Sequence, residues 1–313
     1  MSITVNDLKK SYGTREAIKG ISFSVERGEI VGFLGPNGAG KTTTMKVITC
    51  YMPPTSGNVQ VEGMDTVEQS LEVRKKIGYL PEMNPLYLDM PVLDYLEYSA
   101  SLHHIVGQQA QKRISHMVDV CGLSSVRRRD IGELSKGFRQ RVGLAQAMLH
   151  DPDVLIMDEP TSGLDPNQIV EIRSLIRELG RAKTVVLSTH ILSEVQATCD
   201  RVLIINEGLI VADGTPDELQ RSFAGDQRLT VELRTPPPIS FDAVLVRLRS
   251  VPHFVGATLQ SHDNGVFSFD VECAPGADIR ESLFRLAVAE DWVLLGLSRQ
   301  STSLEEVFHK LTT

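Results

Sequence analysis

One segment of eight residues constrains the fold of this chain more than any other part of its sequence. Residues 35–42 match the pattern Gly-x-x-x-x-Gly-Lys-Thr, between an apolar run at 29–34 and a helix-forming run at 43–48. Glycines in such a turn let backbone N–H groups face an anion, and the helix N-terminus adds roughly +0.5 charge there. The pattern predicts a strand, a phosphate-binding loop and a helix. Its candidate nucleotide-binding residues are Gly35, Pro36, Asn37, Gly38, Ala39, Gly40, Lys41, Thr42 and Thr43.

The residue types in this loop and in a later strand indicate nucleoside triphosphate chemistry. Lys41 is expected to reach the terminal phosphates, and the Thr42 hydroxyl is expected to bind Mg²⁺. Residues 154–157 form an apolar strand that ends at Asp158 and Glu159. A phosphate loop needs a carboxylate for Mg²⁺ and a group that orients the attacking water. We therefore expect Asp158 to hold the metal ion and Glu159 to polarise the water.

Composition and charge argue against several other classes of protein. The 313 residues carry 32 Lys and Arg against 40 Asp and Glu, a net charge of −8, which does not favour a nucleic-acid groove. The four cysteines include no C-x-x-C pair, which argues against a disulfide scaffold or a zinc site and fits a reducing compartment. The sequence shows no export leader and no apolar run of membrane-spanning length. We expect a cytoplasmic protein that reaches a membrane only through a partner.

Hydrophobic periodicity predicts an α/β protein. Strands are predicted near 3–5, 21–25, 154–157, 184–187 and 202–205, with helical patterns between the later ones. This alternation is expected of a parallel sheet with crossover helices. The stretch 91–131 has apolar residues at helical spacing and predicts a helical subdomain, set at about 83–150. The first domain is predicted to span 1–222.

A second domain is predicted after a break near residue 225. From 226 to 313 the patterns predict strands and helices in the order β-α-β-β-α-β, followed by a last helix at 304–310. This order is typical of a small ferredoxin-like α+β domain. The chain shows no convergent polar chemistry in this part, so support of a dimer is the favoured role here, and binding of a small regulatory ligand is the other.

Four further segments or positions resemble those of ATP-binding-cassette (ABC) ATPases, in that family's order. Residues 134–141, Leu-Ser-Lys-Gly-Phe-Arg-Gln-Arg, resemble the family's signature sequence. The other matching positions are Tyr12, the 162–165 loop that ends at Asp165, and His190. The resemblance covers residues 1 to about 220. It implies an ABC domain with a P-loop NTPase fold: a mixed sheet with helices plus a helical subdomain.

The resemblance also implies a role for each motif. Tyr12 is expected to stack on adenine, His190 to contact the γ-phosphate, and Asp165 to touch an opposite subunit. The signature residues Ser135, Lys136 and Gly137 are expected to act in trans, since in the family two subunits stack head to tail. There the helix that begins after Ser135 meets the γ-phosphate held by the partner's loop. The implied assembly is a homodimer that binds two ATP molecules with Mg²⁺ at shared sites and hydrolyses them.

One position departs from the family pattern. Most of the family has glutamine where residues 77–82, Ile-Gly-Tyr-Leu-Pro-Glu, end in Glu82. Glutamate occurs there in the branch that this chain resembles best, so the site is expected to be active. Glu82 is a candidate metal or water ligand.

Two segments resemble the ATPase subunits of bacterial or archaeal type-two exporters: residues 79–82 and the ending at 303–311. This branch implies separate transmembrane permease subunits, an ATPase held at the inner face of the cell membrane, and transport driven by ATP-dependent dimerisation. Residues 81–91 hold three prolines and several apolar side chains, and they predict a docking surface for the permease. The other possibility is that Leu86 and Leu88 pack inward. An ABC ATPase that works without a permease, as a clamp in a soluble complex, is the alternative function.

Overall fold

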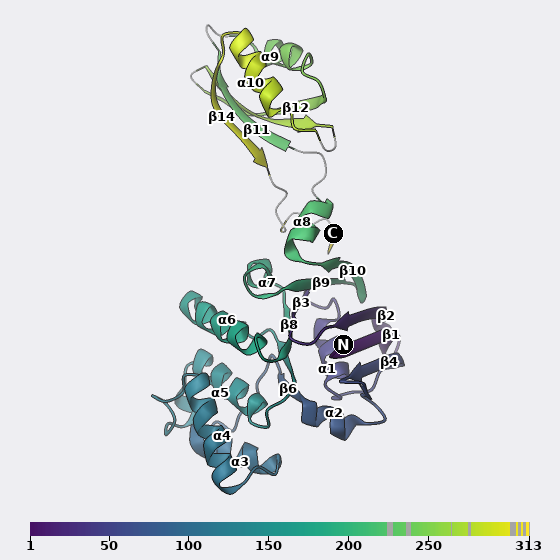
Figure 1. Ribbon diagram of the computed structural model, residues 1–313, viewed down its shortest axis with the longest axis vertical. Coiled ribbons are helices and arrows are strands. Elements are labelled where there is room, and N and C mark those ends of the chain that lie inside the picture. Colours follow the sequence, from purple (N-terminus) through teal and green to yellow (C-terminus); the bar gives the residue numbers. More distant parts are fainter. Residues whose placement is uncertain are drawn as a thin grey trace. The chain divides into compact units, whose positions relative to one another are not determined.

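The chain folds into two compact units (Figure 1). The computed structural model describes residues 1–223, 228–235, 239–263, 265–274 and 277–300, and positions 305, 308, 311 and 312. The units are Met1–Pro216 together with Phe308–Thr313, and Asp217–Val307. This division differs from the predicted one, because the end of the chain belongs with the first unit. There the side-chain amide of Asn206 donates to the carbonyl oxygen of Leu311 at 3.3 Å.

A six-stranded sheet forms the centre of the first unit. Its strands follow the order β10-β9-β3-β8-β7-β6, parallel from β9 to β6, with β10 antiparallel at one edge. The strands in the middle of the sheet are buried along their whole length, as expected of a parallel sheet covered on both faces. Their bounds are β3 (Ile30–Leu34), β6 (Ile77–Leu80), β7 (Val154–Asp158), β8 (Thr184–Thr189), β9 (Arg201–Asn206) and β10 (Leu209–Gly214).

A smaller antiparallel sheet packs against this one. Its strand order is β2-β1-β4-β5, with β1 (Ile3–Tyr12), β2 (Arg15–Val25), β4 (Ser56–Val61) and β5 (Met64–Asp65). Helix α1 (Lys41–Ile48) belongs to the same buried apolar cluster as both sheets. Within it the rings of Phe23 and Phe33 lie 5.3 Å apart. This core fixes the position of the loop between β3 and α1.

The remaining helices of the first part of the chain include the predicted helical subdomain. Figure 1 shows α3, α4 and α5 together, and α5 contacts the sheet at β6. The predicted helical stretch at 91–131 is thereby confirmed. The bounds are α2 (Ser70–Lys76), α3 (Val92–Leu102), α4 (Gly107–Val120), α5 (Lys136–Met148), α6 (Pro166–Gly180), α7 (Leu192–Thr198) and α8 (Pro216–Phe223), with a 3₁₀ turn at Ile131–Glu133. Within the described ranges, every helix is too short or too polar to cross a bilayer.

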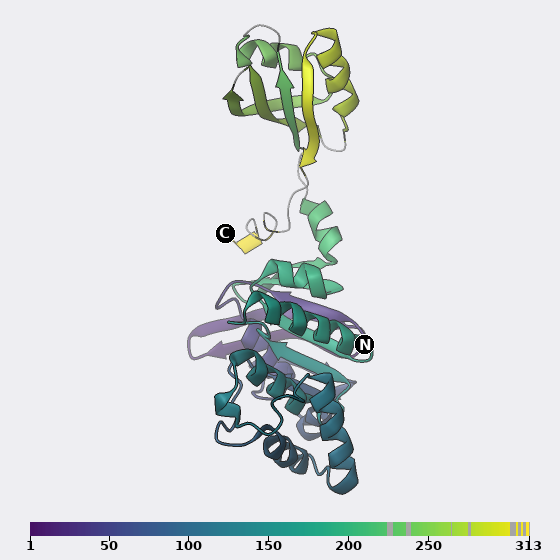
Figure 2. The same ribbon diagram turned by 90° about the vertical axis from the view of Figure 1, so that its left-hand side faces the viewer.

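The second unit has its own sheet and core (Figure 2). All of its strand pairs are antiparallel, in the order β12-β13-β11-β14, and burial alternates along β13, so one face of the sheet is covered. The element order β-α-β-β-α-β is the predicted one, while the ferredoxin-like assignment stays a prediction. The predicted helix at 304–310 lies mostly outside the described residues. The bounds are β11 (Arg228–Arg234), α9 (Phe241–Leu248), β12 (Phe254–Asp263), β13 (Val266–Cys273), α10 (Arg280–Ala289) and β14 (Val293–Gln300).

Candidate functional site

The glycine-rich loop connects β3 to α1 at the carboxyl edge of the central sheet. Gly40 precedes α1 with φ +115°, a backbone conformation that glycine adopts without strain. Gly35 has no space for a side chain, because a Cβ there would collide with the carbonyl oxygen of Ile205. Both glycines therefore let the loop pack closely against the residues around it.

Lys41 is held under this loop. Its side chain is buried, and its ammonium group donates to the carbonyl oxygens of Gly35 at 2.8 Å and Pro36 at 3.2 Å. The same nitrogen lies 3.4 Å from Oε1 of Glu159. Two backbone acceptors and one carboxylate therefore fix a positive charge at the position where the loop pattern predicts phosphate binding.

Asp158 has the features of a metal-binding carboxylate. Its side chain is 1% exposed at the end of β7, and Oδ1 accepts a hydrogen bond from the hydroxyl of Ser188 at the end of β8. Oδ2 is buried and has no hydrogen-bond partner among the described residues. Those residues also contain no cluster of three or more His, Cys, Asp or Glu that would hold a metal ion. This donor set fits Mg²⁺, which typically takes one or two protein ligands together with waters and phosphate oxygens.

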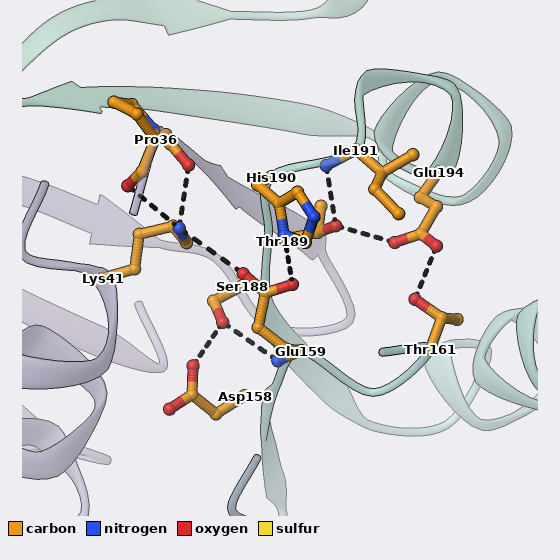
Figure 3. A network of polar contacts seen from close by, with 11 residues as sticks. Pro36, Lys41, Asp158, Glu159, Thr161, Ser188, Thr189, His190, Ile191 and Glu194 are labelled. Atoms are coloured by element: carbon orange, nitrogen blue, oxygen red, sulfur yellow. Dashed lines mark hydrogen bonds and ion pairs between the residues drawn. The ribbon is translucent and has the colours of Figure 1, made fainter. Parts of the chain in front are cut away.

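Glu159 connects Lys41 to His190. While Oε1 lies near Lys41, Oε2 lies 2.8 Å from Nδ1 of His190, and only 7% of the residue is exposed (Figure 3). Its φ of +49° is uncommon for a residue with a side chain, and such strain concentrates at functional sites. The backbone N–H of Glu159 points at the carbonyl and hydroxyl oxygens of Ser188, each at 3.1 Å. The carboxylate is thus fixed between a cation and an imidazole.

A cavity of about 690 Å³ brings most of the predicted site residues together. The exposed Tyr12 lies in its wall, with its hydroxyl 3.0 Å from the sulfur of Met52. Two lining residues, Arg15 and Ala17, were not predicted from the sequence, and a third, Ser162, was predicted only as part of the 162–165 loop. The predicted residues that line it are Tyr12, Asn37, Gly38, Gly40, Lys41, Thr42, Thr43, Glu82, Glu159 and His190. Gly35, Pro36, Ala39 and Asp158 are not part of this wall, although Pro36, Ala39 and Asp158 each adjoin a lining residue in the chain.

The signature residues lie apart from this cavity. None of the described residues that line the cavity belongs to the segment 134–141. Ser135 is the N-cap of α5, and its hydroxyl accepts from the N–H of Phe138 at 3.4 Å. The side chain of Gln168 in α6 lies directly over Gly137, and the side chain of Lys136 lies over Gly163 in the loop before α6. Asp165 is the N-cap of α6 and accepts from the N–H of Gln168 at 3.0 Å.

Several partners of the site residues were missed by sequence reasoning. Ser188 and Thr189 end β8, and Glu194 lies in the first turn of α7. The available signal was a pair of hydroxyl residues directly after the apolar run 184–187, which indicates polar groups at the carboxyl edge of the sheet. The sequence carries no comparable signal for Arg15.

Known proteins match this arrangement over most of the chain. The model of the ABC transporter family matches residues 18–162. The linearmycin resistance ATP-binding protein LnrL of Bacillus subtilis (strain 168) is 34% identical over 313 residues, which covers 99% of this chain and 98% of LnrL. The chain belongs to the ABC transporter family. It is an ATP-binding and ATP-hydrolysing subunit of that family. The daunorubicin resistance ATP-binding protein DrrA3 of Streptomyces coeruleorubidus is 36% identical over 251 residues, 80% of this ABC ATPase and 79% of DrrA3.

Solved structures match the fold of the ABC ATPase. The structure of an ATP-binding subunit of an ABC transporter has a TM-score of 0.65 and 30% identity, and the match covers 71% of this chain and 93% of that one. A dimeric ATP-binding cassette in a post-hydrolysis state, bound to ADP and Pi, has a TM-score of 0.63 and 25% identity. The match covers 68% of this chain and 98% of the cassette. The predicted P-loop NTPase fold is therefore confirmed.

Proposed function

We propose that this chain is the ATPase of an exporter and drives a separate membrane permease by ATP-dependent dimerisation with a second copy of itself. The observation that carries the proposal is the division of the site. The phosphate loop, Glu159 and His190 share one cavity, whereas the signature lies elsewhere in the same chain. A complete site then requires two copies, each of which provides one part.

The residues of the cavity account for binding and proton transfer. Backbone N–H groups of the loop and Lys41 bind the β- and γ-phosphates, and Tyr12 offers an exposed ring to the base. Glu159 accepts the proton of the attacking water, and His190 holds the carboxylate at its second oxygen. Thr42 and Asp158 are the residues that would hold Mg²⁺, with Glu82 as a further candidate. Bound there, Mg²⁺ supplies positive charge that neutralises phosphate oxygens.

The proposed role of the second copy follows from α5. Its first turn has N–H groups without partners inside the helix and carries the positive end of the helix dipole. Lys136 adds a positive side chain at the same end. When Ser135, Lys136 and Gly137 of one copy face the γ-phosphate bound by the other, they stabilise negative charge there. Asp165 is the proposed contact of the neighbouring loop with the partner. ATP then joins the two copies, and hydrolysis separates them.

The direction of transport is proposed from the relatives. LnrL and DrrA3 are named for resistance to linearmycin and daunorubicin, and export of a toxic compound is a common basis of resistance. A separate permease would select the transported compound. The negative net charge supports a partner other than nucleic acid.

The proposed permease contact is the surface at the start of the helical subdomain. Met83 is 87% exposed, and Tyr87, Leu88 and Leu102 are exposed by half or more. The ring of Tyr87 packs edge-on against two further tyrosines. Leu86 is buried, so the inward packing weighed above applies to Leu86 and not to Leu88. Grouped exposed apolar side chains mark a protein interaction surface. We propose that this surface holds the ATPase at the inner face of the membrane.

Replacing the loop lysine tests the proposal. Lys41→Ala removes the ammonium group that three oxygen atoms hold in place, and phosphate release by the purified protein is expected to fall at least 100-fold. Lys46→Ala is the matched control: Lys46 belongs to the same helix, but it lies outside the cavity and near the ring of Tyr51. It should keep the wild-type rate. Near wild-type hydrolysis by Lys41→Ala contradicts the proposed site.

A further inference from the structure

A buried carboxylate lies beside the catalytic residues and has no part in the chemistry described so far. Glu194 is only 3% exposed. Its Oε1 accepts a hydrogen bond from the hydroxyl of Thr161 at 2.5 Å, and its Oε2 accepts one from the hydroxyl of Thr189 at 2.7 Å (Figure 3). Both threonines are buried as well. A buried charge is costly unless hydrogen bonds satisfy it, and here each oxygen has one donor.

The direction of these hydrogen bonds explains the residue type. The hydroxyl of Thr189 already accepts from the backbone N–H of Ile191 at 3.0 Å, so its single proton points at Glu194. The hydroxyl of Thr161 donates from the other side. A carboxylate accepts from both hydroxyl groups at once, whereas a glutamine accepts from only one of them. A glutamine would place an N–H donor against one of the two hydroxyl groups.

The two threonines lie close in the chain to two different catalytic residues. Thr161 lies two residues after Glu159, and its carbonyl oxygen accepts from the N–H of Leu164, next to Asp165. Thr189 directly precedes His190. Glu194 thus joins the loop after β7 to the end of β8, although the two threonines are 28 residues apart in the chain. The contact that depends on this spacing is the 2.8 Å pair between His190 Nδ1 and Glu159 Oε2.

We propose that Glu194 is a positioning residue for ATP hydrolysis. Through Thr161 and Thr189 it holds His190 against the carboxylate of Glu159. It touches neither the cavity nor the reacting atoms, since the described lining residues do not include it. Its loss acts on the rate of the chemical step and leaves nucleotide binding intact, because Lys41 is held by separate carbonyl oxygens. The inference rests on the proposed function of Glu159 and His190.

The cleanest test removes one hydroxyl group. Thr161→Val keeps the shape of the side chain and loses its donation to Glu194, whereas Thr161→Ser keeps that hydroxyl. We expect Thr161→Val to lower kcat about 10-fold, which corresponds to ~1.4 kcal/mol in the activation barrier. Its KM and the dissociation constant for ATP should stay within about twofold of wild type. Thr161→Ser should restore kcat to within about twofold. Val118→Ala, a buried position in α4, controls for a general loss of stability.

A double variant tests whether Glu194 acts through His190. In a His190→Ala background, Glu194→Gln should change kcat less than twofold, because the contact that it supports is already lost. The single Glu194→Gln variant should lower kcat at least fivefold. Three results would each overturn the inference. One is an unchanged kcat in Thr161→Val, and another is a rise in its KM as large as the fall in its kcat. The third is a fall in kcat on Glu194→Gln that is as large beside His190→Ala as in the single variant. Equal ATP hydrolysis by wild type and Lys41→Ala would contradict the proposed function itself. This result is distinct from a failure of the Glu194 inference alone, in which Lys41→Ala still loses hydrolysis.

Discussion

Replacement of Glu159 by glutamine separates ATP binding from hydrolysis. The variant keeps the shape of the side chain and removes its charge and its capacity to accept a proton. Lys41 still has the carbonyl oxygens of Gly35 and Pro36 as partners, so the phosphate clamp stays in place. His190 can still bond to the amide oxygen. The perturbation therefore falls on the chemical step, and we expect ATP affinity equal to that of wild type or higher.

The magnitude follows from the role of a general base. Such a group contributes about 10²- to 10⁴-fold to the rate, which is ~2.7 to ~5.4 kcal/mol in the barrier. Phosphate release under saturating ATP and Mg²⁺ should fall at least 100-fold. Uncleaved ATP should then hold two copies together, and size-exclusion chromatography should show a dimer that is absent without nucleotide.

A control variant and two results make this prediction refutable. Glu72→Gln changes an exposed glutamate of α2 that pairs with Lys75, and it should hydrolyse ATP at the wild-type rate. Hydrolysis by Glu159→Gln within threefold of wild type contradicts the role given to Glu159. A variant that stays monomeric in saturating ATP and Mg²⁺ contradicts the shared site.

Two further predictions concern the metal ion and pH. Asp158→Asn should lower Mg²⁺-dependent hydrolysis at least 100-fold. The substitution removes the negative charge from the carboxylate whose buried Oδ2 has no partner in the described residues, and so weakens its binding of the metal ion. An unchanged Mg²⁺ dependence of phosphate release would contradict this prediction. Burial, together with electrostatic repulsion from His103, whose ring stacks on that of His150, lowers the pKa of His150 to about 4. In the unfolded chain the pKa of this histidine is about 6.5. The free energy of unfolding therefore has its full value above that pH and falls between about pH 6.5 and 4. At pH 5.5 the loss is about 1 kcal/mol after allowance for solvent screening. Urea unfolding at pH 7.5 and 5.5 measures this loss of stability. An equal loss in His150→Gln would contradict its assignment to His150.

The sequence predicted those parts of the site that depend on local spacing. The strand, loop and helix around Lys41 are consecutive in the chain, so the glycine pattern determines both the fold and the chemistry. Asp158 and Glu159 follow a buried strand, and the carboxyl edge of a parallel sheet is where such residues meet a ligand. The helical stretch at 91–131 was predictable because its apolar residues recur at helical spacing.

Other contacts were not predictable, because they join segments far apart in the sequence. Ser188 orients Asp158 across two neighbouring strands, and the register of those strands had to be known. Glu194 resembles any first-turn acid of a short helix until its burial and its two hydroxyl partners are seen. The association of Leu311 with the first unit depends on a hydrogen bond to Asn206, 105 residues earlier.

A mixture of two inactive variants tests the central claim most directly, which is that each ATP is hydrolysed between two copies. Lys41→Ala removes the phosphate clamp, and Ser135→Arg blocks the N-terminus of α5. Each variant alone should release no phosphate above background. Mixed in equal amounts, the two variants should form heterodimers with one intact site. At random pairing half of the dimers are mixed, and each mixed dimer has one intact site out of two. About a quarter of the wild-type activity should therefore return. A mixture as inactive as its components, with heterodimers demonstrated, would contradict the account.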